Sequence, residues 1–169
     1  TFNIETPILL RRRIIEGVIP VLLSAIENGK SIRFNYASAS NPIGAGRNVS
    51  PSKLAYCGTR LHLRAYCHTK SSYRDFVVSR ILMIPKFLEK EFPIEYDLKW
   101  ETKHALEIIP NKHLSKDAQA LINEEFNLEG SKIIEVRECL IHYFLQDNSI
   151  PSSKEQIDMA KKNPWSYPI

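Results

Sequence analysis

Short segments with a two-residue period, separated by tight turns, constrain the fold of this chain more than any other feature. In "RLHLRAYC", at residues 60–67, one parity is apolar and the other is cationic and rich in hydrogen-bonding groups. The first set is Leu61, Leu63 and Ala65, and the second is Arg60, His62, Arg64 and Tyr66. Alternation of this kind is typical of a half-buried strand. The sequence therefore predicts a strand whose polar face is either solvated or binds an anion.

Strand and turn signals continue on both sides of this stretch. Residues 31–37, 47–56 and 73–84 have strand character, and tight turns are expected at 57–59 and 68–72. The small residues of 38–46 predict a flexible loop that closes over or around a ligand. Short strands joined by tight turns within about 55 residues predict a small, strongly curved sheet or barrel.

Helical periodicity precedes this sheet and returns after it. We expect a helix between the capping residue Thr6 and Gly29, kinked or divided at Pro20. Later predictions are strands at 92–101 and 105–109, a helix capped by Ser115, and a helix at 133–144 whose start is alternatively a strand. The chain therefore divides into a β module and a smaller α+β module.

Charge is distributed unevenly between these modules. The whole chain of 169 residues carries a net charge of +4. Residues 30–80 carry +8, from nine Lys and Arg and one acid, whereas residues 81–169 carry −4. Such asymmetry predicts an anionic partner for the basic segment. A chance clustering of solvated charges is the alternative.

A cationic pocket follows if residues 60–66 and 73–80 pair as a hairpin. Should Arg74 or Arg80 share a face with Arg64, several guanidinium groups converge. Guanidinium groups bind phosphates through two parallel hydrogen bonds, which favours a phosphate-containing ligand.

Aromatic residues and one acid complete this hypothesis. Tyr36 and Tyr66 would stack on a base or hydrogen-bond a phosphate. Asp75 is expected to orient an arginine through an ion pair. In the alternative interpretation, the strand arginines pair with acids of the second module instead of a ligand.

The chain carries no recognisable catalytic or metal-binding motif. It has no paired carboxylates, no GxSxG, no P-loop and no CxxC pair. Its three unpaired cysteines fit a reducing cytoplasm, and no apolar run approaches the roughly 20 residues that cross a bilayer. We therefore expect a cytoplasmic binding protein without a cofactor or a membrane partner, and not an enzyme.

Four spaced motifs follow one another in a defined order. They are "LLSAIENGKSIRFNYASAS", "GRNVSPSKLAY", "RLHLRAYC" and "YRDFVVSRI". This order resembles the WYL family, ligand-sensing domains of bacterial transcription regulators. The Trp-Tyr-Leu triplet of that family would fall at Leu61, His62 and Leu63. Histidine in the middle place is similar to the subgroup that represses anti-phage defence operons, the BREX- and CBASS-associated regulators.

The resemblance implies an α+β fold with a small Sm-like or SH3-type β-barrel. It implies a helical linker (1–29), a ligand-sensing WYL barrel (30–84), a WCX-like dimerisation module (92–150) and a tail (151–169). Carried over by position, the ligand-binding residues are Tyr36, Ser38, His62, Arg64, Arg74 and Arg80. Additional ligand or phosphate contacts are expected from Arg47, Ser52 and Tyr66.

The resemblance also implies the partners. They are a nucleic acid or nucleotide-derived ligand, a second copy of the chain, and operator DNA bound through a winged helix-turn-helix. Residues 1–29 predict one interrupted helix, so we expect the chain to be the sensor and dimerisation part of a longer repressor. The alternative is a stand-alone RNA- or single-strand-binding module, whose affinity would fall steeply with salt.

Overall fold

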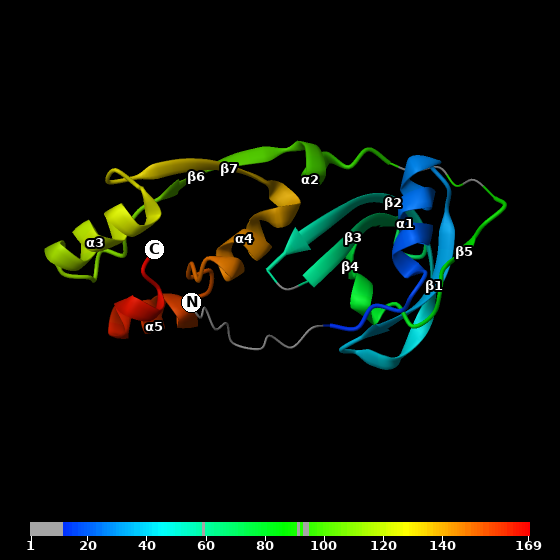
Figure 1. Cartoon of the computed structure of the whole chain (residues 1–169), viewed down its shortest axis with the longest axis horizontal. Helices are drawn as coiled ribbons and strands as arrows, with labels where there is room; N and C mark the ends of the chain where they lie inside the picture. Colours follow the sequence, from blue (N-terminus) through cyan, green and yellow to red (C-terminus); the bar gives the residue numbers. More distant parts are fainter. Residues whose placement is uncertain (1–11, 59, 91, 93–94) are drawn as a thin grey trace, which may run out of the picture. The chain divides into compact units, whose positions relative to one another are not determined.

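The computed structural model describes residues 12–58, 60–90, 92 and 95–169. The chain divides into two compact units, residues 1–95 and 96–169 (Figure 1). The chain is a mixed α/β protein with a five-stranded antiparallel sheet in the first unit and a two-stranded sheet in the second. Across the described ranges, no helix is both long and apolar enough to span a membrane.

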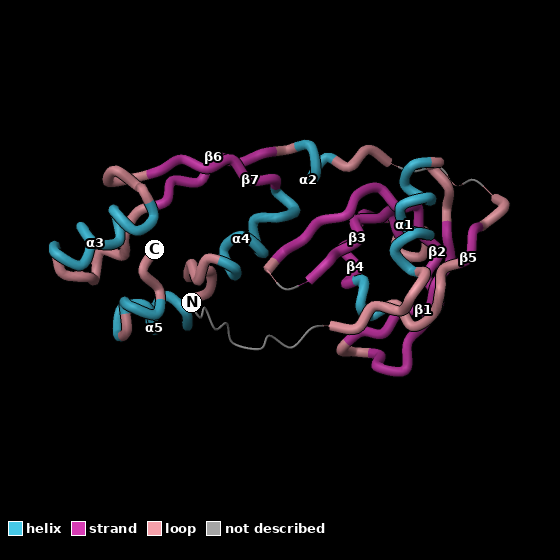
Figure 2. The backbone as a smooth tube through the Cα atoms, viewed as in Figure 1, coloured by secondary structure: helices cyan, strands magenta, loops and turns pink. Residues whose placement is uncertain are grey.

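The N-terminal unit is a sheet covered by one helix. Its elements are α1 (Val18–Glu27), β1 (Ile32–Ser38), β2 (Asn41–Cys57), β3 (Arg60–Cys67), β4 (Ser72–Val77), η1 (Val78–Arg80) and β5 (Lys86–Phe87). The strand order is β4-β3-β2-β1-β5 (Figure 2). Pro20 lies in the first turn of α1, where backbone N–H groups have no partner within the helix, so it neither kinks nor divides this helix. The predicted cap at Thr6 lies outside the described residues.

Strand β2 gives the sheet its curvature. Its first half pairs with β1 and its second half with β3, and the two halves meet near Val49. The register shifts between Pro51 and Lys53, so Ser52 is an extra residue in a β-bulge. An isolated bridge joins Tyr36 to Ile81 and brings the chain after β4 back to β1. The pairings of the described residues stop at this bridge and do not establish a closed barrel.

The core of this unit lies between α1 and the apolar face of the sheet. Leu22 of α1 and Phe34, Val49 and Leu63 of β1, β2 and β3 are fully or almost fully buried. All four belong to one hydrophobic cluster. At roughly 25 cal/mol for each Å² of apolar surface removed from water, this cluster is the main source of stability of the sheet. The predicted apolar parity of residues 60–67 is therefore the core face, as expected.

Two predicted boundaries in this unit are wrong. Residues 41–46 belong to β2, not to a loop, because their backbone groups pair with β1 although their side chains are small. Gly44 has a φ of +94° and lies against Leu82, where a Cβ atom would be 2.6 Å from Leu82 Cδ1. The strand predicted at 73–84 ends at Val77, since the next three residues turn as η1.

The C-terminal unit packs helices on a hairpin. Its elements are α2 (Leu98–Glu101), β6 (Lys103–Ile108), α3 (Lys116–Phe126), β7 (Lys132–Arg137), η2 (Glu138–Leu140), α4 (Ile141–Asp147), α5 (Lys154–Lys162) and η3 (Pro164–Ser166). Ser115 caps α3 as predicted, because its hydroxyl accepts the Ala118 N–H at 3.2 Å. Residues 132–137 form a strand, which confirms the alternative for the start of 133–144.

The strand predicted at 92–101 is wrong for the described part of that range. The carbonyl of Asp97 accepts the N–H groups of Trp100 and Glu101, so the chain turns into α2. Tyr96 and Leu98 are exposed, which means that the alternating apolar positions do not face a core. A two-residue period indicates a strand only where a sheet is available to bury one face.

Candidate functional site: the outer face of β3 and β4

The polar parity of β3 forms a continuous face with β4. Residues that lie opposite each other in antiparallel strands share a face of the sheet. Arg64 lies opposite Asp75, Tyr66 opposite Tyr73, and His62 opposite Val77. This side of the two strands, which we call the outer face, points away from the core residues Leu63 and Ala65. His62, Arg64 and Tyr66 are buried all the same, each less than 9% exposed.

Arg64 and Asp75 form the charged centre of the outer face. The Arg64 Nη1 donates to Asp75 Oδ1 at 3.2 Å, and the side chains are 5% and 19% exposed. The Arg64 guanidinium also lies over the Tyr73 ring, 5.4 Å from its centroid. The expected role of Asp75 in orienting an arginine is therefore confirmed. Because a buried guanidinium requires a compensating anion, Asp75 is the group with which an anionic ligand would compete.

Aromatic rings continue the outer face beyond this pair. Tyr66 contacts Tyr73 edge-on at a centroid distance of 5.4 Å, and it contacts His68 at the same distance. The His68 ring stacks on Phe92 at 4.4 Å with 27° between the planes. These contacts join the hairpin of β3 and β4 to the segment that ends the N-terminal unit.

His68 and Tyr66 both titrate away from their ordinary ranges. Burial lowers the pKa of His68 because it disfavours the imidazolium. Its Nε2 shares a hydrogen bond with the Ser50 hydroxyl at 2.9 Å, and Ser50 in turn shares one with Ser31 at 2.7 Å. Burial also raises the pKa of Tyr66, and the nearby carboxylate of Glu95 raises it further. Both rings are therefore neutral at pH 7.

The structure does not gather all of the predicted ligand residues on the outer face. Arg74 lies opposite Ala65, so its Cβ leaves the sheet on the core side, at an exposed position. Tyr36 lies in the core, where its hydroxyl accepts the Val77 N–H at 3.0 Å. Arg74 therefore does not share a face with Arg64. Arg64 lies opposite Asp75, whereas Arg74 lies opposite Ala65, whose side chain points to the other side of the sheet.

The other predicted contacts lie at the ends of the strands. Ser38 accepts the Asn41 N–H at 3.2 Å in the turn between β1 and β2. Arg47 donates to the neighbouring Gly46 carbonyl at 2.9 Å. Ser52 is the bulge residue of β2, and Arg80 is the half-buried last residue of η1. Their ligand contacts stay predictions.

Three members of the site were not singled out from the sequence: Ser50, His68 and Phe92. His68 and Phe92 are 24 residues apart, and no local pattern indicates that they stack. His68 continues the parity of His62, Arg64 and Tyr66 one step past the end of β3, which is the signal that was available.

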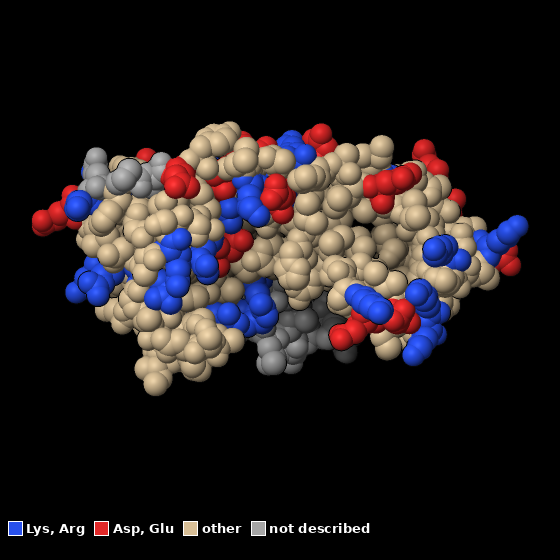
Figure 3. Space-filling view, turned by 180° about the vertical axis from the view of Figure 1, so that it is seen from behind, with Lys and Arg blue, Asp and Glu red and all other residues tan. Residues whose placement is uncertain are grey.

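Basic side chains form several patches on one face of the sheet unit (Figure 3). On the C-terminal unit, in the same view, acidic and basic side chains alternate. Arg33 and Arg74 are among the exposed cations of the sheet unit. Some cations of the basic segment are thus exposed to solvent, whereas Arg64 is buried.

Two family models match the chain over adjoining ranges. Residues 17–85 match the WYL domain, and residues 104–165 match the C-terminal dimerization domain of the BrxR transcriptional regulator. The first match covers the curved antiparallel sheet of the N-terminal unit, and the second covers most of the α+β unit that follows it. The chain belongs to this WYL-domain family, with a BrxR-type C-terminal domain.

Three curated proteins named CapW are similar to this chain in sequence. The chain is 31% identical to the DNA-binding transcriptional repressor CapW of Escherichia coli (strain KTE188) over 160 residues, which is 91% of this chain and 54% of that protein. The CapW of Pseudomonas aeruginosa has the same identity and coverage, and that of Stenotrophomonas maltophilia is 24% identical over 79% of this chain and 46% of its own. The chain spans about half the length of the curated relatives it matches.

One solved structure overlaps weakly with the chain. It is proteasome accessory factor B/C (PafBC) of Arthrobacter aurescens, with a TM-score of 0.39 and 18% identity over 85% of this chain and 25% of that chain. The domain matches and the repressor names agree with the expectation of a regulatory protein that is not an enzyme.

Proposed function

We propose that this chain is the ligand-sensing and dimerisation region of a bacterial transcriptional repressor. The ligand, a nucleic acid or a nucleotide-derived signal, binds at the outer face of β3 and β4. One observation carries this proposal: Arg64 is a buried guanidinium whose counterion, Asp75, keeps 19% of its side-chain surface exposed. A phosphate that approaches from solvent reaches Asp75 first and can replace it on Arg64.

Exchange of anions on Arg64 gives the ligand a differential affinity for two states. With Asp75 bound, the pair is neutral and the outer face is closed. With phosphate bound, the guanidinium makes two parallel hydrogen bonds, and the displaced Asp75 carboxylate is repelled towards solvent. A ligand shifts a conformational equilibrium only through such a difference in interaction between the states.

The contacts of Tyr66 and His68 provide a route from this exchange to the dimerisation unit. The His68 ring holds Phe92, and the Leu88 N–H donates to the Ser31 carbonyl at 2.9 Å. Both contacts attach the end of the N-terminal unit to the sheet. A shift of Tyr66 on ligand binding would move His68 and weaken its contact with Phe92. The conformation of the segment that leads into residue 96 would then change.

The remaining parts of the proposal rest on the family. The finer assignments are an Sm-like barrel at 30–84, with its bridge from Tyr36 to Ile81 as partial support, and a dimerisation module at 92–150. They also include a homodimer, operator DNA bound through a domain of the complete protein, control of an anti-phage defence operon, and a cytoplasmic location. The ligand roles of eight of the nine predicted site residues belong to the proposal as well, whereas Arg74, on the opposite face, serves as the control. The CapW relatives are named as DNA-binding repressors, which supports the regulatory part.

The test is a binding titration with matched arginine variants. Fluorescent single-stranded DNA and RNA of about ten nucleotides, ATP and a cyclic dinucleotide are titrated at about 50 and 200 mM salt. Arg64→Gln should weaken binding about tenfold or more, because it removes a charge-assisted contact. Arg74→Gln, on the opposite face of the neighbouring strand, is the control and should change affinity less than twofold if the outer face is the site.

A second variant, Asp75→Asn, distinguishes a loss of ligand contact in Arg64→Gln from a loss of folding, because a folding defect cannot tighten binding. Removal of the competing carboxylate should tighten ligand binding several-fold, the opposite sign to Arg64→Gln. If both variants bind like the wild type, the outer face is not the site. If all probes bind with similar affinity, and Arg74→Gln lowers that affinity as much as Arg64→Gln does, the chain is a non-selective single-strand binder instead.

A further inference from the structure

The hairpin of the C-terminal unit carries one lysine, Lys132, on the face that it turns to its own core, and the side chain of this lysine is exposed. In the pairing of β6 with β7, Lys132 lies opposite Ile108, and Ile134 lies opposite Leu106. Opposed residues share a face, and residues 132, 134 and 136 have the same parity. Ile108 and Val136 are buried, so this is the inner face of the hairpin. Lys132 is therefore placed where the pattern calls for an apolar residue.

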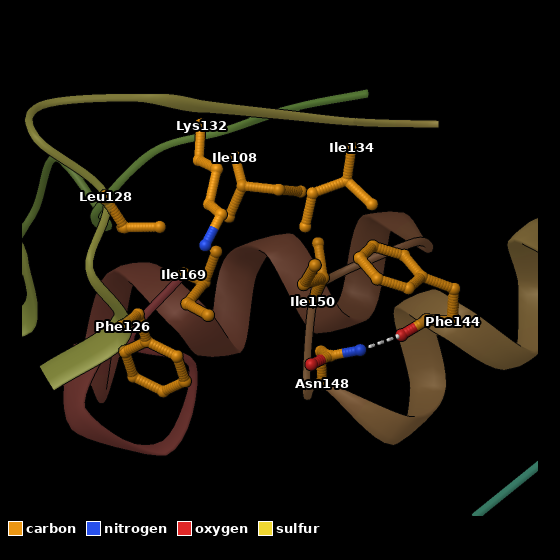
Figure 4. A pocket seen from close by; sticks show the side chains of 9 residues that line it. All are labelled: Ile108, Phe126, Leu128, Lys132, Ile134, Phe144, Asn148, Ile150 and Ile169. Atoms are coloured by element: carbon orange, nitrogen blue, oxygen red, sulfur yellow. Dashed lines mark hydrogen bonds between the residues drawn. The ribbon is translucent and has the colours of Figure 1, made fainter. Parts of the chain in front are cut away.

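A small apolar hollow lies beside Lys132. It is lined by Ile108, Leu128, Ile134 and Phe144, among others, which come from β6, β7, α4 and the loop after α3. Figure 4 shows the Lys132 side chain descending into this hollow, with its ammonium group towards Ile169. The amide nitrogen of Asn148 is turned away to the Phe144 carbonyl, to which it donates at 2.8 Å. Lys132 is thus the cation of an otherwise apolar site.

Lys132 has no anionic partner among the described residues. The ion pairs of this unit involve other side chains, among them Lys103 with Glu135 at 3.2 Å. Lys103 and Glu135 belong to the opposite, outer parity of the same two strands. The hairpin thus pairs Lys103 with a carboxylate, whereas the exposed Lys132 beside the hollow has none among the described residues. A solvated ammonium needs no counterion, but beside an apolar hollow it can pair with an anion whose apolar part fills the hollow.

We propose that this hollow binds a short-chain aliphatic carboxylate. The carboxylate pairs with the Lys132 ammonium, and the alkyl chain fills the space between Ile108, Ile134 and Phe144. The free space is about 80 Å³. A cavity of roughly 150 Å³ holds a benzene ring in another protein, so the enclosed chain here has about three to five carbons. The site lies within the dimerisation unit and does not depend on the function proposed for the outer face.

Isovalerate is the probe, and its uncharged amide is the matched analogue. Both tryptophans, Trp100 and Trp165, lie in the C-terminal unit, so their fluorescence reports on this unit. Saturation-transfer NMR on the full chain gives a second, direct readout of contact. A ligand of so few atoms is expected to bind with a dissociation constant near 1 mM. The amide should bind about two- to fivefold more weakly, because it lacks the charge that the exposed Lys132 recognises.

Two lysine variants separate the charge of Lys132 from general effects. Lys132→Met keeps a long apolar stem and should abolish the preference for isovalerate over its amide. Lys103→Met, on the outer parity of the same hairpin, should keep that preference. The proposal is overturned if isovalerate does not saturate the wild-type chain up to about 20 mM, if the amide binds equally well, or if Lys132→Met retains the preference.

Discussion

Removal of the Asp75 charge tests the buried ion pair of the outer face directly. Asp75→Asn keeps the shape of the side chain and one acceptor oxygen, but it removes the carboxylate that pairs with the Arg64 cation, which is 5% exposed. Loss of one partner of a buried pair costs about 3–5 kcal/mol. Because Asp75 is 19% exposed and asparagine still accepts a hydrogen bond, we expect the low end, about 3 kcal/mol, or roughly a hundredfold in the unfolding equilibrium.

Hydrogen exchange is the suitable assay, since tryptophan fluorescence reports on the other unit. Amide groups of β3 and β4 exchange through opening of the sheet, so their protection measures its local stability. Asp75→Asn should speed exchange in residues 60–67 and 72–77 by roughly a hundredfold. The control is Glu135→Gln, which breaks the exposed pair with Lys103 and should cost less than about 1 kcal/mol.

A double variant identifies the cause. Arg64→Met combined with Asp75→Leu removes both charges, and well-packed apolar replacements of buried pairs are often neutral or stabilising. The double variant should therefore recover most of the protection that Asp75→Asn loses. Unchanged exchange in Asp75→Asn would refute the reasoning, because Arg64 would then be compensated without Asp75. A double variant as unstable as the single one would assign the loss to packing and not to charge.

Three further predictions concern titration, capping and the core. Because burial lowers the pKa of His68, the folded state binds fewer protons than the unfolded state, and stability is lost as pH falls through about 6.5 towards the lower folded pKa. His68→Gln should flatten this loss in urea titrations at pH 5–7.5, and His113→Gln, at an exposed site, should not. Ser153→Ala removes the capping box of α5 and should cost about 1 kcal/mol, seen as faster amide exchange confined to that helix. Leu63→Ala opens a cavity in the sheet core and should cost about 3 kcal/mol in thermal unfolding followed by circular dichroism, and a loss below 1 kcal/mol would contradict its full burial.

Local patterns predicted those parts of the fold that local physics controls. The alternation in residues 60–67 identified the core face of β3, since side chains of a strand point to alternate sides. Ser115 identified the start of α3 because a cap acts within one turn. The same kind of signal, Ser153 with Gln156, precedes α5 and marks its start.

Predictions failed where pairing with a distant segment decided the outcome. The small side chains of residues 41–46 carry no period and predict a loop, yet the backbone of these residues completes β2. Tyr96 and Leu98 alternate like a strand but meet no sheet. The separation of Arg74 from Arg64 depends on register, which a one-residue shift reverses and which composition does not specify.

The sequence by itself determined the family, the strand-rich basic segment, the apolar face of β3 and the role of Asp75 as partner of an arginine. These depend on spacing within about ten residues or on motif order, and both are written directly in the chain. Only the tertiary structure decided that Arg64 is buried, that Tyr36 belongs to the core, that His68 stacks on Phe92, and that Lys132 shares a face of its hairpin with Ile108. Burial, register and contacts between distant residues arise from the packing of the whole unit, because each depends on what lies opposite a side chain and not on its neighbours in sequence.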